Sequence, residues 1–283
     1  MNIAILGAYG LVGSNICKVL ERDYPDVVIT KYKCDEFTFE NDLVDAVIFC
    51  AGYGQPAMFS ADKLKTIRIN TESLIDSFNL LKNRGKFLYV STSEVYSGAK
   101  SPHKETDIGT TTPQHPRACY IEGKRCGEAI CMAYKEQGYD VKIARLALAY
   151  GLGTKKGDTR VINQFIEQAL TKGSICLRDK GEAMRTYLYI EDCAEMMLDI
   201  LFKGKGVVYN VGGQSRVSIL DLAKTIGAIT KAEVFCGDVA LQGAPDDVYL
   251  DLSKILKEFP RDFLSLEEGL IRTINYQKEL YGV

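Results

Sequence analysis

Short apolar runs rich in β-branched residues alternate with stretches of helical periodicity along the first half of the chain. A helix is predicted to begin near Leu11, and two more to cover about 60–83 and 119–137. Nearly continuous apolar strands separated by helical crossovers are typical of a parallel sheet that helices cover on both faces. We therefore predict an α/β fold with a Rossmann-type, doubly wound parallel sheet. Its strands are expected at 2–6, 26–32, 45–51, 86–92 and 141–148.

The pattern changes after about residue 150, where a polar, glycine-rich loop precedes further helical segments. Helices are expected near 160–171, 218–229 and 266–280, with a strand near 207–211. This half is too short and too poor in strands for a second full sheet, so we predict a smaller, interleaved substrate domain. The predicted division is a dinucleotide-binding domain at 1–148, to which 186–212 returns, and a substrate-binding domain at 149–185 and 213–283.

The bulk composition is that of an ordinary globular protein. The chain has 283 residues, of which 46% are hydrophobic and 25% charged, with a formal net charge of −2. This balance gives no reason to expect nucleic acid or an anionic membrane surface as a partner. No apolar run reaches the roughly 18 residues that span a bilayer, and the apolar start of the chain is too short for a signal peptide. We expect a cytoplasmic protein.

Nine cysteines and only two histidines bear on disulfides and metal binding. Most of the cysteines, such as Cys50 and Cys131, sit within apolar segments and lack the paired short spacings of zinc sites. We therefore expect reduced, buried thiols that pack as small hydrophobic groups. His103 and His115 both stand near prolines, and no metal site is expected.

A glycine triplet follows the first predicted strand directly and opens the first predicted helix. Glycines in this setting permit a tight turn, a close approach of the backbone to a pyrophosphate and close packing of helix on sheet. The phosphates would lie at the positive end of the helix dipole. A merely flexible turn would not need three glycines at this spacing. We predict dinucleotide binding by the G-x-x-G-x-x-G residues Gly7, Tyr9, Gly10, Leu11, Val12 and Gly13.

The end of the second predicted strand bears on the choice between NAD and NADP. An acidic residue there binds the ribose 2′-hydroxyl, whereas basic residues accept a 2′-phosphate. Lys31 and Lys33 come first and favour NADP, while Asp35 follows closely enough to reach the ribose or the adenine. The lysines are equally compatible with a solvated strand end. NAD and NADP therefore both remain open.

Two Tyr-x-x-x-Lys pairs are candidates for a proton-transfer pair. Tyr96 and Lys100 lie among turn residues, so they are not expected to share a helical face. Tyr120 and Lys124 open a stretch of amphipathic periodicity, in which residues four apart are neighbours. We therefore predict that Tyr120 and Lys124 are the functional pair.

The spacing of Tyr120 and Lys124 suits a tyrosine that acts as a base. A free phenol has a pKa of about 10, but a neighbouring ammonium and an oxidised nicotinamide would stabilise the phenolate. Tyr120 could then take the proton of a sugar hydroxyl as hydride leaves the carbon. A hydroxyl from the Ser-Thr-Ser-Glu stretch at 91–94, at the carboxyl edge of a predicted strand, could hold the same substrate oxygen.

Several motifs together resemble the extended short-chain dehydrogenases/reductases of the nucleotide-sugar epimerase/dehydratase type. The likeness runs nearly the length of the chain, through GAYGLVG, STSEVY, PRACYIEGKR, MRTYLYIEDCA, YNVGG and SLEEGL. The resemblance implies a catalytic triad of Thr92, Tyr120 and Lys124. It also implies cofactor-binding roles for Asn70, Ala51, Gly52 and Tyr53, besides Tyr120 and Lys124.

The motifs STSEVY and PRACYIEGKR are especially similar to those of UDP-glucuronate decarboxylases. In such enzymes the glutamate acts with the triad after C4 is oxidised, so the resemblance makes Glu94 a candidate acid/base, with a structural carboxylate as the alternative. Arg185 matches a family arginine that meets the substrate phosphate or carboxylate, with a surface salt bridge as the alternative. The predicted substrate-binding residues are Thr92, Ser93 and Arg185.

The chain also departs from the family pattern. Leu148 stands where the family has an asparagine, and Asp247 and Val248 replace an expected arginine; both family residues help to hold the diphosphate. The stretch between strands two and four is shortened, as in GDP-fucose synthases and related keto-sugar reductases. The front half therefore favours a reductase, and the catalytic segments favour an epimerase, dehydratase or decarboxylase.

Three functions remain open. The leading hypothesis is an NAD(P)-dependent enzyme that oxidises a nucleotide sugar at C4 and then epimerises, dehydrates or decarboxylates the keto intermediate. An NADPH-dependent keto-sugar reductase is the alternative, and a non-catalytic dinucleotide sensor is the third. The resemblance also implies a homodimer through the helices at about 60–83 and 119–137, with Cys126, Ile130 and Cys131 on the shared face or in the core.

Overall fold

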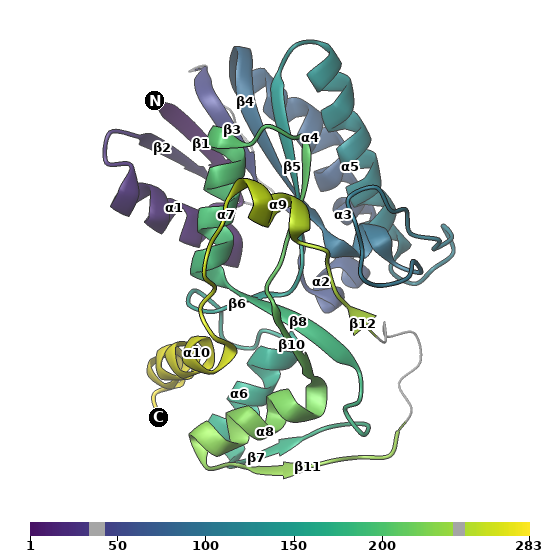
Figure 1. Ribbon diagram of the computed structural model, residues 1–283, viewed down its shortest axis with the longest axis vertical. Coiled ribbons are helices and arrows are strands. Elements are labelled where there is room, and N and C mark those ends of the chain that lie inside the picture. Colours follow the sequence, from purple (N-terminus) through teal and green to yellow (C-terminus); the bar gives the residue numbers. More distant parts are fainter. Residues whose placement is uncertain (34–42, 240–246) are drawn as a thin grey trace.

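Six parallel strands form the central sheet of the protein (Figure 1). The structure is a computed structural model, and it describes residues 1–33, 43–239 and 247–283. The strand order is β2-β1-β3-β4-β5-β9, so the chain winds outward from a switch point between β1 and β3. The predicted doubly wound parallel sheet is confirmed. The strands are β1 (Asn2–Leu6), β2 (Val28–Tyr32), β3 (Val44–Phe49), β4 (Leu81–Thr92), β5 (Asp140–Leu146) and β9 (Val208–Val211).

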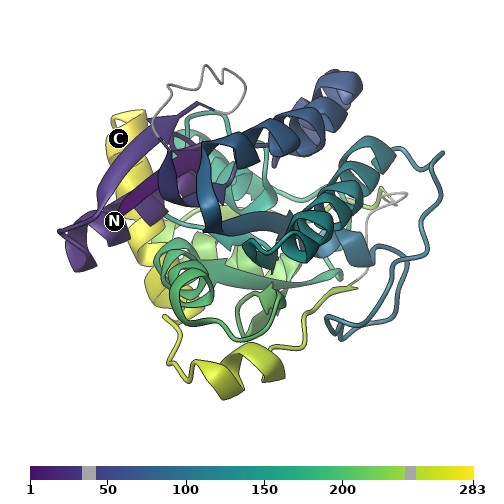
Figure 2. The same ribbon diagram turned by 90° about the horizontal axis from the view of Figure 1, so that it is seen from above.

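Helices cover both faces of this sheet, because successive side chains of a strand point to opposite faces. Neighbouring residues of β1 accordingly belong to different cores: Ile3 packs on the side of α1 and α7, and Ala4 on the side of α3 and α5. Figure 2 shows the teal helix α5 and the green helix α7 on opposite sides of the strands. These helices are α1 (Leu11–Asp23), α3 (Lys63–Asn70), α5 (Ala118–Glu136) and α7 (Ile190–Lys203).

The helix expected at about 60–83 is broken, so this prediction is wrong in its extent. The side chain of Asp62 accepts a hydrogen bond of 2.9 Å from the Lys65 amide and starts a new helix there. Leu81 already pairs with Val44 of β3, so the end of the expected helix is strand. Local capping and strand pairing outweigh the helical periodicity. The segment consists of α2 (Pro56–Ala61), α3, α4 (Glu72–Ser77), the 3-10 turn η1 (Phe78–Leu80) and the start of β4.

The second half of the chain builds a smaller lobe, which lies below the large sheet in Figure 1. Its central strand is β8 (Met184–Tyr189), which pairs with β6, β10 and β12. A third apolar core lies between these strands and three helices. The other elements are β6 (Ala149–Tyr150), α6 (Val161–Lys172), β7 (Ser174–Cys176), β10 (Ser215–Ser218), α8 (Ile219–Thr230), β11 (Glu233–Phe235), β12 (Asp247–Val248) and α10 (Leu266–Tyr281).

The chain passes back and forth between the two lobes. From the small lobe it returns to the large sheet, where α7 packs on one face and β9 pairs with β5. The core that α1 and α7 share also contains Leu250 and Leu252, and it contains Ile255 from α9 (Ser253–Glu258). Helix α10 then ends the chain in the small lobe. The exact domain boundaries given above stay a prediction.

The described cysteines are free thiols of mixed exposure. Cys131 is buried as expected, but Cys126 is exposed on the same helix, since one face of α5 points away from the sheet. Apolar neighbours in the sequence therefore overstate the burial of a cysteine on an amphipathic helix. Within the described parts of the chain, no helix is long and apolar enough to cross a bilayer, and no three His, Cys, Asp or Glu side chains gather as metal ligands.

Gly127→Ala is expected to destabilise the fold although alanine favours a helix. The added Cβ would lie 2.6 Å from Cζ of the fully buried Tyr89. Such overpacking costs about 1–3 kcal/mol, against a gain of about 1 kcal/mol from helix propensity. Chemical denaturation should show a lower free energy of unfolding.

The matched control is Gly123→Ala in the same helix. Its Cβ would lie 3.5 Å from Asn70 Cβ, an ordinary van der Waals contact. This substitution should leave the free energy of unfolding unchanged or raise it. Equal losses in the two variants would contradict the packing argument.

Candidate active site

The glycine loop between β1 and α1 is shaped so that only glycine fits at its two ends. Gly7 has a φ of 82°, and a Cβ there would lie 2.9 Å from the Ala51 amide nitrogen. A Cβ on Gly13 would lie 2.8 Å from Ala8 Cα. The N-cap of α1 is Gly10, which offers no side-chain cap to the first amides of the helix. A bare helix N-terminus beside a cradle that a Cβ would fill fits a dinucleotide pyrophosphate.

The turn after β3 meets two of the predicted cofactor-binding residues. Gly52 has a φ of 139°, and a Cβ there would lie 3.7 Å from Lys124 Nζ and 3.8 Å from Asn70 Oδ1. Asn70 is fully buried, donates to Thr66 O at 2.8 Å and accepts from the Tyr89 hydroxyl at 3.2 Å. The structure therefore brings Gly52, Asn70 and Lys124 together at the carboxyl end of the sheet.

Lys124 reaches from α5 to the backbone of β4. Its ammonium donates to Val90 O at 2.8 Å and lies 4.7 Å from the centre of the Tyr89 ring. The side chain is buried, and a buried ammonium is retained only where it is hydrogen-bonded. This anchor fixes the nitrogen beside the turn that carries Gly52.

Tyr120 and Thr92 lie together where α5 meets the end of β4. The Thr92 hydroxyl lies close enough to lower the pKa of Tyr120, and both side chains are buried. Burial and, to a smaller extent, the charge of Glu94 raise the pKa of Tyr120 to about 12, while Thr92 and Arg117 oppose the rise. Lys124, which was expected to stabilise the phenolate together with an oxidised nicotinamide, is not among the groups that lower this pKa, and desolvation outweighs the neighbouring charges of the protein.

Glu94 lies in the 3-10 turn η2 (Ser93–Tyr96) that follows β4 directly. Its amide donates to Thr92 Oγ1 at 3.2 Å, and its carboxylate forms an ion pair with Arg117. Burial raises the pKa of Glu94, and the charge and hydrogen bond of Arg117 oppose that rise. The sequence reasoning did not single out Arg117, although it lies in the quoted motif PRACYIEGKR.

Phe59 of α2 was also missed. Its ring stacks on Tyr120 with 4.7 Å between ring centres and 5° between planes. The Arg117 guanidinium lies 5.4 Å from the centre of the same ring. A phenylalanine in the segment AMFSA carries no sequence signal for such a place, since its position depends on how α2 folds over α5.

The remaining predicted residues lie around this centre. Ser93 is half-buried at the start of η2, and Arg185 lies on β8 in the small lobe, between Val217 of β10 and Val248 of β12. Lys31 forms an ion pair of 2.8 Å with Glu21 of α1. The side chain of Tyr9 is exposed, and Tyr53 packs beside Phe59 and Tyr120. Asp35 lies outside the described residues.

Tyr96, the rejected candidate, is fully buried and has a structural role. Its hydroxyl donates to Asn210 Oδ1 at 2.7 Å and accepts from Arg145 Nη1 at 2.8 Å. It lies in a 3-10 turn, and Lys100 follows outside any helix. The prediction that Tyr96 and Lys100 do not share a helical face is confirmed.

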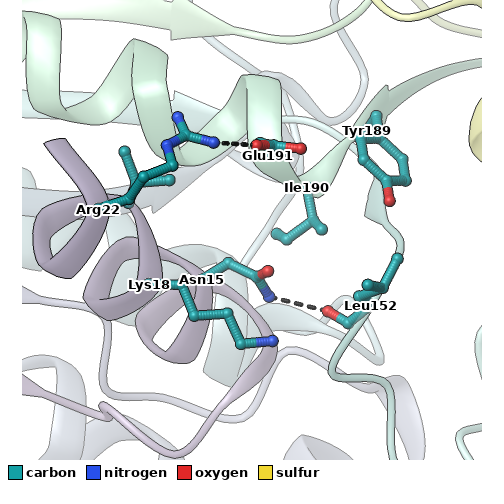
Figure 3. A pocket seen from close by; sticks show the side chains of 8 residues that line it. Asn15, Lys18, Arg22, Leu152, Tyr189, Ile190 and Glu191 are labelled. Carbon is teal, nitrogen blue, oxygen red and sulfur yellow. Dashed lines mark hydrogen bonds and ion pairs between the residues drawn. The ribbon is translucent and has the colours of Figure 1, made fainter. Parts of the chain in front are cut away.

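A cavity of about 210 Å³ opens elsewhere, between α1 and the start of α7 (Figure 3). Asn15 donates across it to Leu152 O at 2.8 Å, and Arg22 pairs with Glu191. None of the residues that line it belongs to the predicted site. The cavity is a feature of the α1–α7 seam, apart from Tyr120 and Lys124.

Comparison with known proteins places the chain among sugar-modifying enzymes. The sequence model of the NAD dependent epimerase/dehydratase family matches residues 3–212. UDP-glucuronic acid decarboxylase 1 of Xenopus tropicalis is 29% identical, over 98% of this chain and 72% of its own length. The family resemblance drawn from the motifs is confirmed.

Solved structures show the same fold. UDP-glucuronic acid 4-epimerase from Bacillus cereus, in complex with UDP-glucuronic acid and NAD, has a TM-score of 0.84 at 22% identity, over 99% of this chain and all of that one. RMD from Pseudomonas aeruginosa, complexed with NADPH, has a TM-score of 0.83 at 21% identity, over 100% of this chain and 99% of that one.

Gly13→Ala is expected to weaken binding of NAD or NADP by about tenfold or more, because relieving an overlap with Ala8 worth 1–3 kcal/mol must distort the loop. Gly10→Ala is the matched comparison, since its Cβ would lie 3.3 Å from Gly7 O and needs only a small shift. Isothermal titration calorimetry with both dinucleotides measures the effect. Equal affinities of the two variants would speak against the cradle.

Proposed function

Because the chain belongs to the NAD dependent epimerase/dehydratase family, we propose that it oxidises a nucleotide sugar at C4 and returns the hydride after a second step. That second step is epimerisation, dehydration or decarboxylation of the keto intermediate. The substrate class is supported by the relatives and by the Bacillus cereus neighbour, which carries UDP-glucuronic acid and NAD.

The observation that carries this proposal is the placement of Tyr120 beside Thr92 at the carboxyl end of β4, close enough for the Thr92 hydroxyl to lower the pKa of Tyr120, and one helical turn from Lys124. Parallel sheets bind their ligands at this edge. The arrangement supplies a hydroxyl donor and a proton acceptor for one substrate oxygen. We assign Thr92 to hold that oxygen, Tyr120 to accept its proton and Lys124 to fix the cofactor side of the pocket.

The glycine loop, the turn at Ala51–Tyr53, Asn70 and Lys124 would hold the dinucleotide. When bound, an oxidised nicotinamide takes up hydride and brings a positive charge to the site. That charge favours the Tyr120 phenolate, whose pKa is raised to about 12 by burial. The proton then passes from the sugar hydroxyl to the Tyr120 oxygen, with Thr92 orienting the donor.

Glu94 is assigned to the step that follows oxidation. It lies one residue past Ser93 and two past Thr92, and its charge raises the pKa of Tyr120. We assign it as the acid/base that acts on the keto sugar, and Ser93 and Arg185 as contacts to the substrate. The reductase alternative is motivated by Lys31, Lys33 and the shortened stretch between strands two and four. The pairing of Lys31 with Glu21 in the described structure does not favour it.

We further propose a cytoplasmic homodimer built on α3, α4 and α5. Leu64, Ile67 and Ile75 expose apolar side chains on α3 and α4, and Met132 does so on the neighbouring α5. Cys126 is exposed on α5, whereas the half-buried Ile130 packs against the core to which Cys131 belongs. A shared face of these helices would bury the exposed apolar groups.

Tyr120→Phe is expected to lower kcat about 10²–10⁴-fold, the range of general acid–base catalysis, because it removes the proton acceptor while its ring can still stack on Phe59. Turnover of a panel of nucleotide sugars, followed by product analysis, gives the measurement. Tyr24→Phe is the control, since that ring packs on Phe202 at the far end of α1. Wild-type protein that binds NAD yet turns over no sugar in the panel would refute the proposed function.

Ile67→Glu is expected to convert the dimer into a monomer, because a buried unpaired carboxylate costs several kcal/mol. Ile108→Glu serves as the control, since Ile108 is 80% exposed in a loop away from these helices. Light scattering coupled to size exclusion measures the mass. A dimer that survives Ile67→Glu unchanged would place the interface elsewhere.

A further inference from the structure

We propose that Arg117 is a positioning residue that holds the Glu94 carboxylate ionised and fixed beside Tyr120. The inference deepens the proposed function and rests on it for the role of Glu94. No motif reasoning assigned a function to Arg117, and its contacts with Glu94 and Phe59 carry the proposal.

Arg117 links the two ends of the site through its backbone and its side chain. Its carbonyl accepts from the amides of Tyr120 at 3.0 Å and Ile121 at 3.1 Å, so the residue starts the helix that carries the tyrosine. Its guanidinium pairs with Glu94 at the end of β4. One residue thereby couples the position of the phenol to that of the carboxylate.

Phe59 braces this ion pair. The centre of its ring lies 5.4 Å from the Arg117 guanidinium and 4.7 Å from the centre of the Tyr120 ring. The Nε of Arg117 is buried and has no hydrogen-bond partner among the residues that the structure describes. The cation–π contact with Phe59 and the ion pair with Glu94 are therefore the contacts that orient the guanidinium.

The charges around the pair act in opposite directions. Burial raises the pKa of Glu94, and Arg117, just before α5, is the charged group that lowers it. At Tyr120 on α5, burial and the Glu94 charge raise the pKa, while Thr92 of β4 and Arg117 lower it. Arg117 therefore favours the ionised form of both groups, and it offsets the repulsion that an ionised Glu94 exerts on a phenolate.

Removing the Arg117 charge should raise the pKa of Glu94. The carboxylate would then be lost as the pH falls through a higher value than in the wild type, and regained as the pH rises above that value. Since a base must be ionised to accept a proton, the acidic limb of the kcat profile should move to higher pH. A residue with a structural role alone would lower activity at all pH values without moving this limb.

The test compares Arg117→Gln with Arg117→Lys, because the lysine keeps the charge but not the planar fork. Infrared titration of the carboxyl band, with Glu94→Gln to identify the signal, follows Glu94 in the protein without substrate. Arg117→Gln is expected to change the acid dissociation constant of Glu94 about tenfold or more, which is one pKa unit. Arg117→Lys should shift it less, and the control Arg272→Gln, an exposed pair on α10, not at all.

Thermal melting and dinucleotide affinity establish that each variant is folded. An unchanged Glu94 titration in folded Arg117→Gln would overturn the inference even if the enzyme acts on nucleotide sugars. A shifted titration in a protein whose wild type turns over no nucleotide sugar would refute the proposed function and leave the coupling of Arg117 and Glu94 in place. Matching shifts of the titration and of the kcat profile would support both.

Discussion

The close approach of α5 to β4 is the contact on which the site depends. Gly123 faces Asn70, and Gly127 faces Tyr89. At Gly127 there is no room for a larger side chain. This approach lets the ammonium of Lys124 reach a carbonyl of β4 at 2.8 Å and brings the phenol of α5 to the hydroxyl at the end of the strand. A helix held even slightly farther away would lose both contacts together, since each spans the same gap.

The end of β4 is held in turn by a buried polar network. Glu128 of α5 accepts from Ser91 Oγ at 2.5 Å and pairs with Arg145 of β5 at 2.7 Å, and Arg145 also donates to Tyr96. The Tyr96 hydroxyl in turn donates a hydrogen bond to Asn210 Oδ1 of β9. Burying such charges costs desolvation energy, so the network contributes more to a unique geometry than to stability. It fixes the strand end from behind while Thr92 and Glu94 face the site.

Periodicity and spacing predicted the parts of the fold that are set locally. The apolar runs located the inner strands of the first half because strands buried on both faces must be apolar throughout, whereas β2 lies at the sheet edge with its residues exposed or half-buried. The glycine spacing and the pair Tyr120 and Lys124 were accessible for the same reason, since each is fixed by a single turn of helix. The break at Asp62, the stacking of Phe59 and the pairing of Arg117 with Glu94 depend on segments distant in sequence, and no local pattern encodes them. The raised pKa of Tyr120 was not predicted either, because burial is a property of the assembled fold.

The raised pKa of Tyr120 affects how the proposed mechanism would work. With a pKa of about 12, the Tyr120 phenol is protonated at neutral pH in the absence of cofactor. The ammonium of Lys124 is committed to Val90 O and to the side of the turn at Gly52, so its charge is placed toward the cofactor rather than solely toward the phenol. The charge of Arg117 is likewise divided, because its guanidinium pairs with Glu94 and also lowers the pKa of Tyr120. Under the proposed mechanism, Tyr120 would stay protonated until an oxidised dinucleotide brings a further positive charge and the capacity to take hydride. Proton removal and hydride removal would then depend on the same binding event.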